Sequence, residues 1–383
     1  MRVLGACSLG GAGHLHPLVP ILDAARRRGA DVLVAGPPAI RDLVEDAGYP
    51  FHPGGEPPET EVAPIRERLP VVPPEEATRL GNRELFGRLA TEAMLPTMAA
   101  LCAAWRPDLV VREPAEYSSA IVACRTRVPM AHVAISLAEA EEGSIAVAAP
   151  ALTPVEGGVV DALHAAAYLT RFPAALDPSP FPTTIRFHEP TAPGAPLTDW
   201  WSGSGAPLVY VTLGTVVGHL STAAALYRRL VDAVDGLEAR VLLTVGRHFD
   251  PARLGPVPGH VHVEGWVDQA DVLPDARVVV CHGGSGTVFA ALAAGVPLVV
   301  VPVFGDQVEN GRRVAAAGAG LVASPPDATR RARPADRPGI AEPIRRVLAD
   351  AAYRDAARRI AEGMAATSTA DDALALVLDP LRR

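Results

Sequence analysis

The 383-residue sequence contains no lysine, so all 35 basic side chains are arginines. A phosphate-binding P-loop needs a lysine after its second glycine, and pyridoxal phosphate enzymes and lysine nucleophiles need an amine. The missing lysine therefore excludes these three kinds of chemistry. Charged residues make up only 20% of the chain, and the formal net charge is -8. A nucleic-acid partner is not expected, because such a partner requires a basic face.

Cysteines are also few. Cys7, Cys102, Cys124 and Cys281 are far apart and form no C-x-x-C pair, so neither a zinc ribbon nor a disulfide framework is predicted. The amino terminus lacks both the continuous apolar region of a signal peptide and a membrane span. We expect a cytoplasmic protein with reduced thiols and no stable membrane insertion.

Apolar residues make up 49% of the sequence, and short apolar runs alternate with helical patterns in two successive series. This alternation is typical of the α/β class with parallel sheets and crossover helices. It predicts one domain over residues 1–188 and another over 207–365, joined by a breaker-rich linker over 189–206. Residues 366–383 are expected to form a helix that packs back towards the first domain.

The expected strands begin with Val3–Cys7 in the first series and Leu208–Leu213 in the second. Two segments rich in proline, Pro50–Pro74 and Pro325–Pro338, are expected to be irregular loops. A loop as long as the first is more often functional than accidental, and we expect it to shape a variable binding cleft.

The apolar strand Val278–Cys281 ends in the glycine turn His282-Gly283-Gly284-Ser285-Gly286-Thr287, which opens a helix. Glycines allow the backbone to approach a ligand closely, and the N–H groups and dipole of the first helical turn point at the same place. We predict that this turn binds phosphate through the backbone and the helix end, with His282 as one more donor.

A second glycine turn, Gly10 to Gly13, precedes His14. It does not complete a dinucleotide-binding fingerprint, because G-x-G-x-x-G counted from Gly11 ends at His16. A neutral histidine at the start of a helix can accept a proton from a hydroxyl near pH 7. We predict that His14 is a general base. The alternative is that it only fills the start of the helix.

Glu113 lies two residues after the strand Leu109–Val111, at the same sheet edge as His14. A carboxylate there would fix the tautomer of a histidine base and stabilise its charged form. Glu113 is therefore our candidate for the orienting carboxylate. The competing explanation is a surface ion pair with Arg112.

Asp306, Gln307 and, one helical turn later, Asn310 surround another strand-to-helix turn in the second series. A carboxylate and two amides suit the vicinal hydroxyls of a sugar. Asp306 taken alone would be explained as a helix N-cap. Its position after the strand that follows the His282 turn favours a binding role.

Taken together, these segments resemble bacterial glycosyltransferases of the GT-B fold, the family 1-like inverting enzymes that use nucleotide sugars to decorate antibiotics and other natural products. The resemblance covers nearly the whole chain. Its strongest elements are His282–Thr287 and Phe304-Gly305-Asp306-Gln307 with Asn310. It also rests on Gly13-His14-Leu15-His16-Pro17, Pro107–Glu113, Val211–Thr215 and the nucleobase loop Gly265–Pro274. Asp268 stands where the family commonly has proline, and Glu113 where aspartate is frequent.

The resemblance implies two Rossmann-like domains facing across a cleft, the first for an acceptor substrate and the second for a sugar donor. It implies His14 and Glu113 as catalytic residues and no bound metal. The donor-binding residues that it implies are Gly13, Gly214, Thr215, Trp266, Val267, Gln269, His282, Gly284, Ser285, Gly286, Thr287, Asp306, Gln307 and Asn310.

The reaction implied is transfer of a sugar, favoured to be a deoxysugar, from a nucleotide diphosphate to a hydroxyl of a small natural-product aglycone. Thymidine diphosphate is favoured as the carrier and uridine diphosphate is the alternative. No cofactor is expected, since the helix end would replace a metal and no D-x-D ligand motif is evident. The protein is expected to be a monomer or a homodimer.

Two alternatives stay open from the sequence. A nucleotide-sugar epimerase of the same fold would act on the donor alone, and a non-catalytic accessory protein would only bind the nucleotide sugar. A hydrolase is disfavoured because the sequence contains no G-x-S-x-G nucleophile elbow.

Overall fold

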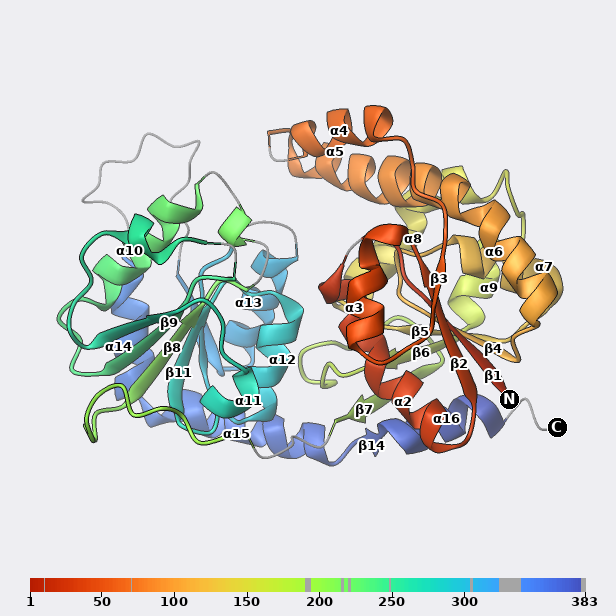
Figure 1. The fold of residues 1–383 in the computed structure, drawn as a ribbon. Coiled ribbons are helices and arrows are strands. Elements are labelled where there is room, and N and C mark those ends of the chain that lie inside the picture. The colour runs from red at the N-terminus through yellow and green to blue at the C-terminus, as the bar shows by residue number, and fades with distance from the viewer. Residues whose placement is uncertain are drawn as a thin grey trace. The chain divides into compact units, whose positions relative to one another are not determined.

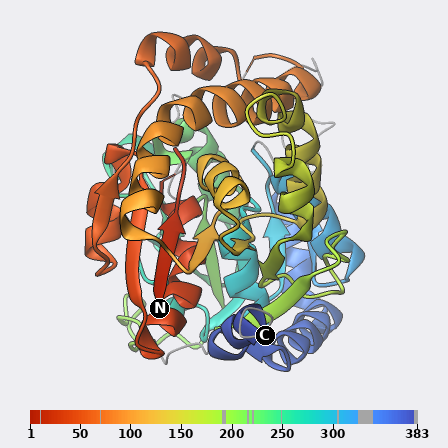
Figure 2. The same ribbon diagram turned by 90° about the vertical axis from the view of Figure 1, so that its right-hand side faces the viewer.

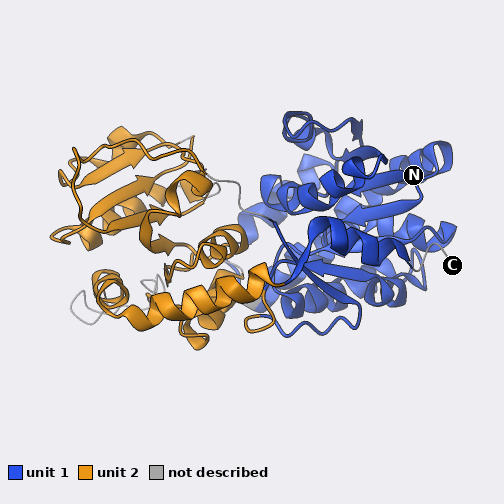
Figure 3. Cartoon of the chain, turned by 90° about the horizontal axis from the view of Figure 1, so that it is seen from below, with its two compact units in different colours: residues 1–172, 177–189, 367–383 blue, residues 173–176, 190–366 orange. Residues whose placement is uncertain are grey.

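The computed structural model describes residues 1–9, 11–69, 71–189, 194–214, 217–219, 222–247, 249–303, 306–323 and 339–379. The chain forms two compact units (Figure 3). Unit 1 contains residues 1–172, 177–189 and 367–383, and unit 2 contains residues 173–176 and 190–366. Thr215, Phe304, Gly305 and the expected loop Pro325–Pro338 lie outside the described residues. None of the described helices has the length and apolar content needed to span a bilayer.

Unit 1 is built on a parallel eight-stranded sheet in the order β14-β7-β6-β5-β4-β1-β2-β3. Helices cover both faces of this sheet (Figures 1 and 2). Its strands are β1 (Arg2–Ala6), β2 (Asp31–Gly36), β3 (Phe51–Pro53), β4 (Leu109–Arg112), β5 (Met130–Val133), β6 (Ala167–Thr170), β7 (Thr184–His188) and β14 (Ser368–Thr369).

Alternate residues of the central strands are buried on opposite faces of the sheet, as the two-residue period of a strand requires. Val3 and Val111 pack with apolar residues of α2 (Val19–Arg27) and α16 (Ala370–Leu378). Leu4 and Val110 pack with α6 (Thr91–Trp105) and α7 (Ser118–Thr126). Burial on both faces explains why these strands are continuous apolar runs in the sequence.

Unit 1 contains further helical segments, and the sequence indicated only some of them. The complete set of these further segments is α1 (Ala12–Leu15), η1 (His16–Leu18), η2 (Pro38–Ile40), α3 (Arg41–Asp46), α4 (Glu59–Arg68), α5 (Pro74–Thr78), the π-helical segment η3 (Arg79–Ala90), α8 (Ala138–Leu152) and α9 (Val159–Ala165).

The expectation that Pro50–Pro74 is an irregular loop was wrong, because the segment contains β3 and α4. Val62 and Ile65 of α4 pack in one apolar cluster with Leu80 and Leu89 of η3. This spacing of three residues is a short helical stripe that the prolines and glutamates around it obscured in the sequence.

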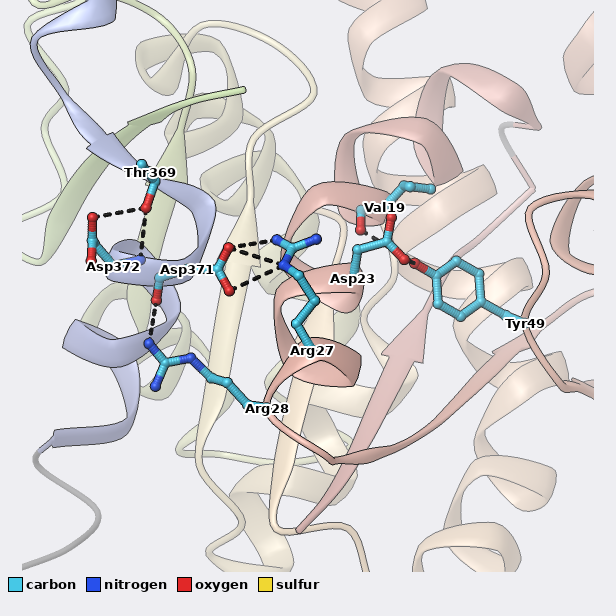
Figure 4. A network of polar contacts seen from close by, with 8 residues as sticks. All are labelled: Val19, Asp23, Arg27, Arg28, Tyr49, Thr369, Asp371 and Asp372. Atoms are coloured by element: carbon cyan, nitrogen blue, oxygen red, sulfur yellow. Dashed lines mark hydrogen bonds and ion pairs between the residues drawn. The ribbon is translucent and has the colours of Figure 1, made fainter. Parts of the chain in front are cut away.

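The end of the chain adds β14 beside β7 and then the helix α16, which packs on α2. Figure 4 shows the polar contacts at this junction. Arg27 Nη2 lies 2.6 Å from Asp371 Oδ2, and Thr369 accepts a hydrogen bond of 3.1 Å from the N–H of Asp372 as the helix N-cap. Exposed ion pairs contribute about 0–1 kcal/mol, so the apolar face of α16 provides most of the stabilisation.

Unit 2 is built on a parallel six-stranded sheet in the order β10-β9-β8-β11-β12-β13. One face packs with α10 (Ala223–Val234) and α14 (Ala341–Ala349), and the other with α12 (Ser285–Ala293), α13 (Gln307–Ala316) and α15 (Ala351–Ala365). Its strands are β8 (Leu208–Thr212), β9 (Arg240–Thr244), β10 (Val261–Glu264), β11 (Ala276–Cys281), β12 (Leu298–Val300) and β13 (Gly320–Val322); the short helical segments η4 (Val217–His219), η5 (Pro251–Leu254) and α11 (Gln269–Val272) connect them.

Candidate active site

The structure brings His14 and Glu113 together at the carboxyl ends of β1 and β4. His14 lies in α1, whose N-cap Gly11 has a φ of 68° that favours glycine. His14 Nδ1 is 3.1 Å from Glu113 Oε2, a close ion-pair distance, although the contact does not meet hydrogen-bond geometry. The imidazole is 19% exposed and the carboxylate 0%. A fully buried carboxylate thus lies behind a partly exposed histidine.

Backbone donors hold the Glu113 carboxylate in place. The N–H of Ser8 donates to Oε1 at 2.9 Å, and the N–H of Ala115 donates to Oε2 at 2.6 Å. Since a buried carboxylate is costly unless it is paired and hydrogen-bonded, these contacts explain how Glu113 stays inside unit 1.

The pKa values of the pair follow from this packing. Burial lowers the pKa of His14, but the charge of Glu113 and the contact with it outweigh burial and raise the pKa above the ordinary 6.5. Burial raises the pKa of Glu113, but His14 and the hydrogen bonds from Ser8 and Ala115 outweigh burial and lower the pKa below 4.5. The carboxylate is therefore charged near neutral pH and favours a proton on Nδ1, which leaves Nε2 as a proton acceptor.

The competing explanation for Glu113, a surface ion pair with Arg112, is wrong. Both side chains are fully buried. The Arg112 guanidinium donates to the carbonyl oxygens of Pro114 and Glu116 and contacts His132, whereas the Glu113 carboxylate contacts His14.

In unit 2 the predicted phosphate turn forms the start of α12. The N-cap Gly284 offers no side chain to the first N–H groups of the helix. Gly286, in the first turn, is exposed, and a Cβ placed there would contact none of the described residues within 4 Å. A helix start whose N-cap has no side chain, and whose first turn no described residue covers at the exposed Gly286, is suited to an anion.

The imidazole of His282 lies against Gly284 of this turn and against Gly214, which follows β8. A Cβ at Gly214 would come within 2.8 Å of the ring, and a Cβ at Gly284 would overlap Nε2. Burial lowers the pKa of His282 to about 4, against the opposing effect of Asp306. His282 is therefore neutral at pH 7 and can act as a hydrogen-bond donor without adding charge.

Asp306, Ser285 and Asn310 form one polar cluster that links the starts of α12 and α13. Asp306 Oδ2 accepts from Ser285 Oγ at 3.2 Å and from Asn310 Nδ2 at 3.3 Å, and Asn310 Nδ2 lies 2.9 Å from the carbonyl oxygen of Gly283. The Asp306 side chain makes no N-cap hydrogen bond to α13, so the plain N-cap explanation does not hold. Gln307 is buried, and its Oε1 accepts from the N–H of Val303 at 2.8 Å, which braces the turn.

The loop after β10 contains the predicted nucleobase residues. Trp266 is 49% exposed, and the Arg247 guanidinium lies 4.3 Å from its ring centroid. Val267 is partly buried against the core, and Gln269 Nε2 lies 3.2 Å from Thr287 Oγ1. Asp268, where the family commonly has proline, caps α11 by accepting from the N–H of Ala270 at 3.0 Å. The departure thus has a local structural role.

The sequence predictions and the structure differ in what surrounds His14. Gly13 is exposed beside it, and no residue in the described part of the chain lies within 4 Å of where its Cβ would be. Phe86 of η3, which carries no motif, stacks on the His14 ring with centroids 6.0 Å apart. Phe86 and the N–H of Ser8 were missed because they reach the site through packing and backbone, neither of which leaves a sequence pattern.

Comparison with known proteins identifies the family. Residues 23–149 and 228–376 match the N-terminal and C-terminal domains of the family described as Erythromycin biosynthesis protein CIII-like. The chain is 33% identical to the L-demethylnoviosyl transferase of Streptomyces niveus, over 94% of this chain and 93% of that protein. It is 32% identical to the elloramycin glycosyltransferase ElmGT of Streptomyces olivaceus, over 91% and 92%.

Solved structures agree. The crystal structure of the glycosyltransferase SnogD from Streptomyces nogalater has a TM-score of 0.76 with 27% identity, over 98% of each chain. That of the glycosyltransferase SsfS6 from Streptomyces sp. SF2575, complexed with thymidine diphosphate, has the same TM-score and identity, over 98% of this chain and 99% of that one. The resemblance seen in the sequence is confirmed: the chain belongs to the Erythromycin biosynthesis protein CIII-like family and is a glycosyltransferase of the GT-B fold, related to those of antibiotic biosynthesis.

Proposed function

We propose that this glycosyltransferase moves a sugar from a nucleotide diphosphate to a hydroxyl group of a small natural-product acceptor substrate, with inversion at the anomeric carbon. The observation that carries this proposal is the pairing of a partly exposed His14 with a buried, charged Glu113. Such a pair is suited to general-base catalysis, because the carboxylate stabilises the imidazolium that forms when a hydroxyl loses its proton.

The proposed reaction is a single displacement. His14 Nε2 takes the proton of the acceptor hydroxyl while its oxygen bonds to the anomeric carbon. The bond from that carbon to the diphosphate oxygen breaks, and its electron pair leaves with the diphosphate. Attack opposite to the leaving group inverts the configuration, and Glu113 stabilises the protonated histidine.

Unit 2 would bind the donor. The uncapped N–H groups at the start of α12 suit the diphosphate, whose charge grows as the bond breaks, so a metal ion is not required in this proposal. Asp306, held by Ser285 and the buried Asn310, would bind sugar hydroxyls, and the exposed Trp266 would contact the nucleobase. Thymidine diphosphate is the favoured carrier because the related SsfS6 structure contains it, and uridine diphosphate is the alternative.

A product assay tests this function. Purified protein would be incubated with thymidine and uridine diphosphate sugars and a panel of hydroxylated aglycones, with EDTA present. We expect a glycoside whose anomeric configuration, measured by NMR, is opposite to that of the donor. Retained configuration, or activity only with added magnesium, would contradict the proposal. A donor-only control that yields an altered sugar would support the epimerase instead.

A further inference from the structure

Arg112, the last residue of β4, is fully buried and makes contacts that the proposed reaction does not yet explain. Its Nε donates to the carbonyl oxygen of Glu116 at 2.6 Å, and its Nη2 donates to that of Pro114 at 2.9 Å. Its Nη1 lies 2.9 Å from His132 Nε2. Burying an arginine charge inside a domain costs free energy unless its N–H donors are hydrogen-bonded. The burial of Arg112 therefore needs an explanation.

The two carbonyl groups belong to the loop between β4 and α7, which also carries Glu113. They flank Ala115, whose N–H holds Glu113 Oε2 at 2.6 Å. The guanidinium thus fixes the backbone on both sides of the donor that orients the carboxylate. The far end of the loop is fixed separately, because the Glu116 carboxylate accepts from the hydroxyl groups of Ser118 and Ser119.

His132 of β5 completes the set of contacts without adding a charge. Its Nε2 faces an N–H donor of Arg112, so it must accept, which requires a neutral ring with the proton on Nδ1. Burial and the charge of Arg112 hold the pKa of His132 well below its ordinary value, in agreement with this geometry. Each of the three guanidinium nitrogen atoms of Arg112 therefore has a buried partner.

We propose that Arg112 is a positioning residue for the transfer reaction, which aims Glu113 at His14 by holding the carbonyl groups of Pro114 and Glu116. This inference rests on the proposed roles of His14 and Glu113. The planar guanidinium donates in several fixed directions at once, which a lysine ammonium cannot do from the same position.

The test compares Arg112→Lys with wild type and with Arg125→Met. Arg125 of α7 serves as the control. Like Arg112 it donates to a backbone carbonyl oxygen, that of Val155, but its other partner is the Glu156 carboxylate, away from Glu113. We expect Arg112→Lys to lower kcat by about 10- to 100-fold, since misplacing a catalytic group by an ångström has effects of this order. The donor KM should change little, and the acid limb of the pH–rate profile should move to lower pH, because His14 loses an aligned carboxylate. Arg125→Met should match wild type.

Double variants separate positioning from general stability. In a Glu113→Gln background, Arg112→Lys should cost little further activity, because residues that act through one another are not additive. If Arg112→Lys folds poorly, His132→Leu, which leaves Nη1 unsatisfied, should lower kcat, and His132→Gln, which keeps an acceptor, should restore it.

The inference is overturned if folded Arg112→Lys retains wild-type kcat and pH profile, or if the substitution costs as much in the Glu113→Gln background as in wild type. Equal kcat for His132→Leu and His132→Gln would also overturn it. Failure of the proposed function has a different signature, since His14→Ala and Glu113→Gln would then keep wild-type turnover whatever Arg112 does.

Discussion

At the scale of single residues, the His14–Glu113 pair shows two opposing effects on one proton. Burial disfavours the imidazolium, and the nearby carboxylate favours it by more, so the net pKa of His14 lies above its ordinary value. A base must be unprotonated to work. The rate of the proposed reaction should therefore rise with pH through a value above 6.5.

Glu113→Gln tests this balance. The amide has no charge to hold the imidazolium, so the pKa of His14 should fall and the acid limb of kcat/KM should move to lower pH. The plateau rate should drop by about 10- to 1,000-fold, because the imidazolium formed in the reaction is no longer stabilised. The measurement is kcat/KM between pH 5 and 9. An acid limb that stays in place would show that Glu113 does not set the titration of His14.

Residues whose chemistry is carried by their own side chain and by a position at a strand end could be predicted from the sequence. His14, Glu113 and His282 are of this kind, and the structure places them at the ends of β1, β4 and β11. Their sugar-transfer roles stay predictions. Phe86 was not predicted, because nothing but packing brings η3 to His14. The hydrogen bond from the N–H of Val303 to the Gln307 side chain could not be predicted from the sequence either.

At the scale of elements, the first turn of α12 contains a glycine that a purely structural helix has no reason to keep. Gly286 is exposed, and among the described residues none lies within 4 Å of where its Cβ would be. In a helix, glycine is less favourable than alanine by about 0.5–1 kcal/mol. The missing side chain is explained if a ligand approaches the first-turn N–H groups.

Gly286→Ala is therefore expected to fold at least as stably as wild type and yet to bind thymidine diphosphate more weakly, by about tenfold or more, because a methyl group would stand in the space for the phosphates. Thermal melting and isothermal titration calorimetry would measure the two effects. Gly283→Ala is the contrasting variant, since its φ of 91° and a Cβ 2.6 Å from Val300 Cγ1 predict loss of stability. Unchanged affinity in Gly286→Ala would remove this helix start from the donor site.

The central buried strands β1, β4, β8 and β11 were predictable as elements, because each is a short apolar run bounded by turn residues. Helix α4 was not, since only Val62 and Ile65 mark its buried face among prolines and acids. Strand β14, two residues long, has no pattern of its own and is defined by pairing with β7.

At the scale of the whole molecule, a buried acid couples the stability of the fold to pH. Glu141 of α8 is buried, and its Oε1 accepts from the N–H groups of Ile135 and Ser136, both at 2.7 Å. Tyr168 donates to its Oε2 at 2.6 Å. Burial raises the pKa of Glu141 to about 8, opposed by these hydrogen bonds and assisted by Asp177.

Because the folded pKa lies above the ordinary 4.5, the folded protein holds this proton more tightly than the unfolded chain does. The contribution to stability is complete below pH 4.5 and is lost as the pH rises through about 8. Glu141→Gln keeps an oxygen for the two N–H groups and removes the titration. Its stability relative to wild type should rise with pH over this window, by at most about 1.4 kcal/mol per pH unit.

Urea unfolding of both proteins at pH 5, 6.5 and 8, values spaced about one and a half units apart across the titration, would measure the difference. Parallel stability curves would show that Glu141 does not carry a raised pKa in the fold.

The central claim is that His14 is the base of a sugar transfer whose donor is bound elsewhere, in unit 2. The most direct test measures kcat and the Kd for thymidine diphosphate on one preparation of His14→Ala. Turnover should fall by about 100- to 10,000-fold, and the Kd for thymidine diphosphate should stay within about twofold of wild type. Turnover close to that of wild type would contradict the assignment of His14 as the base.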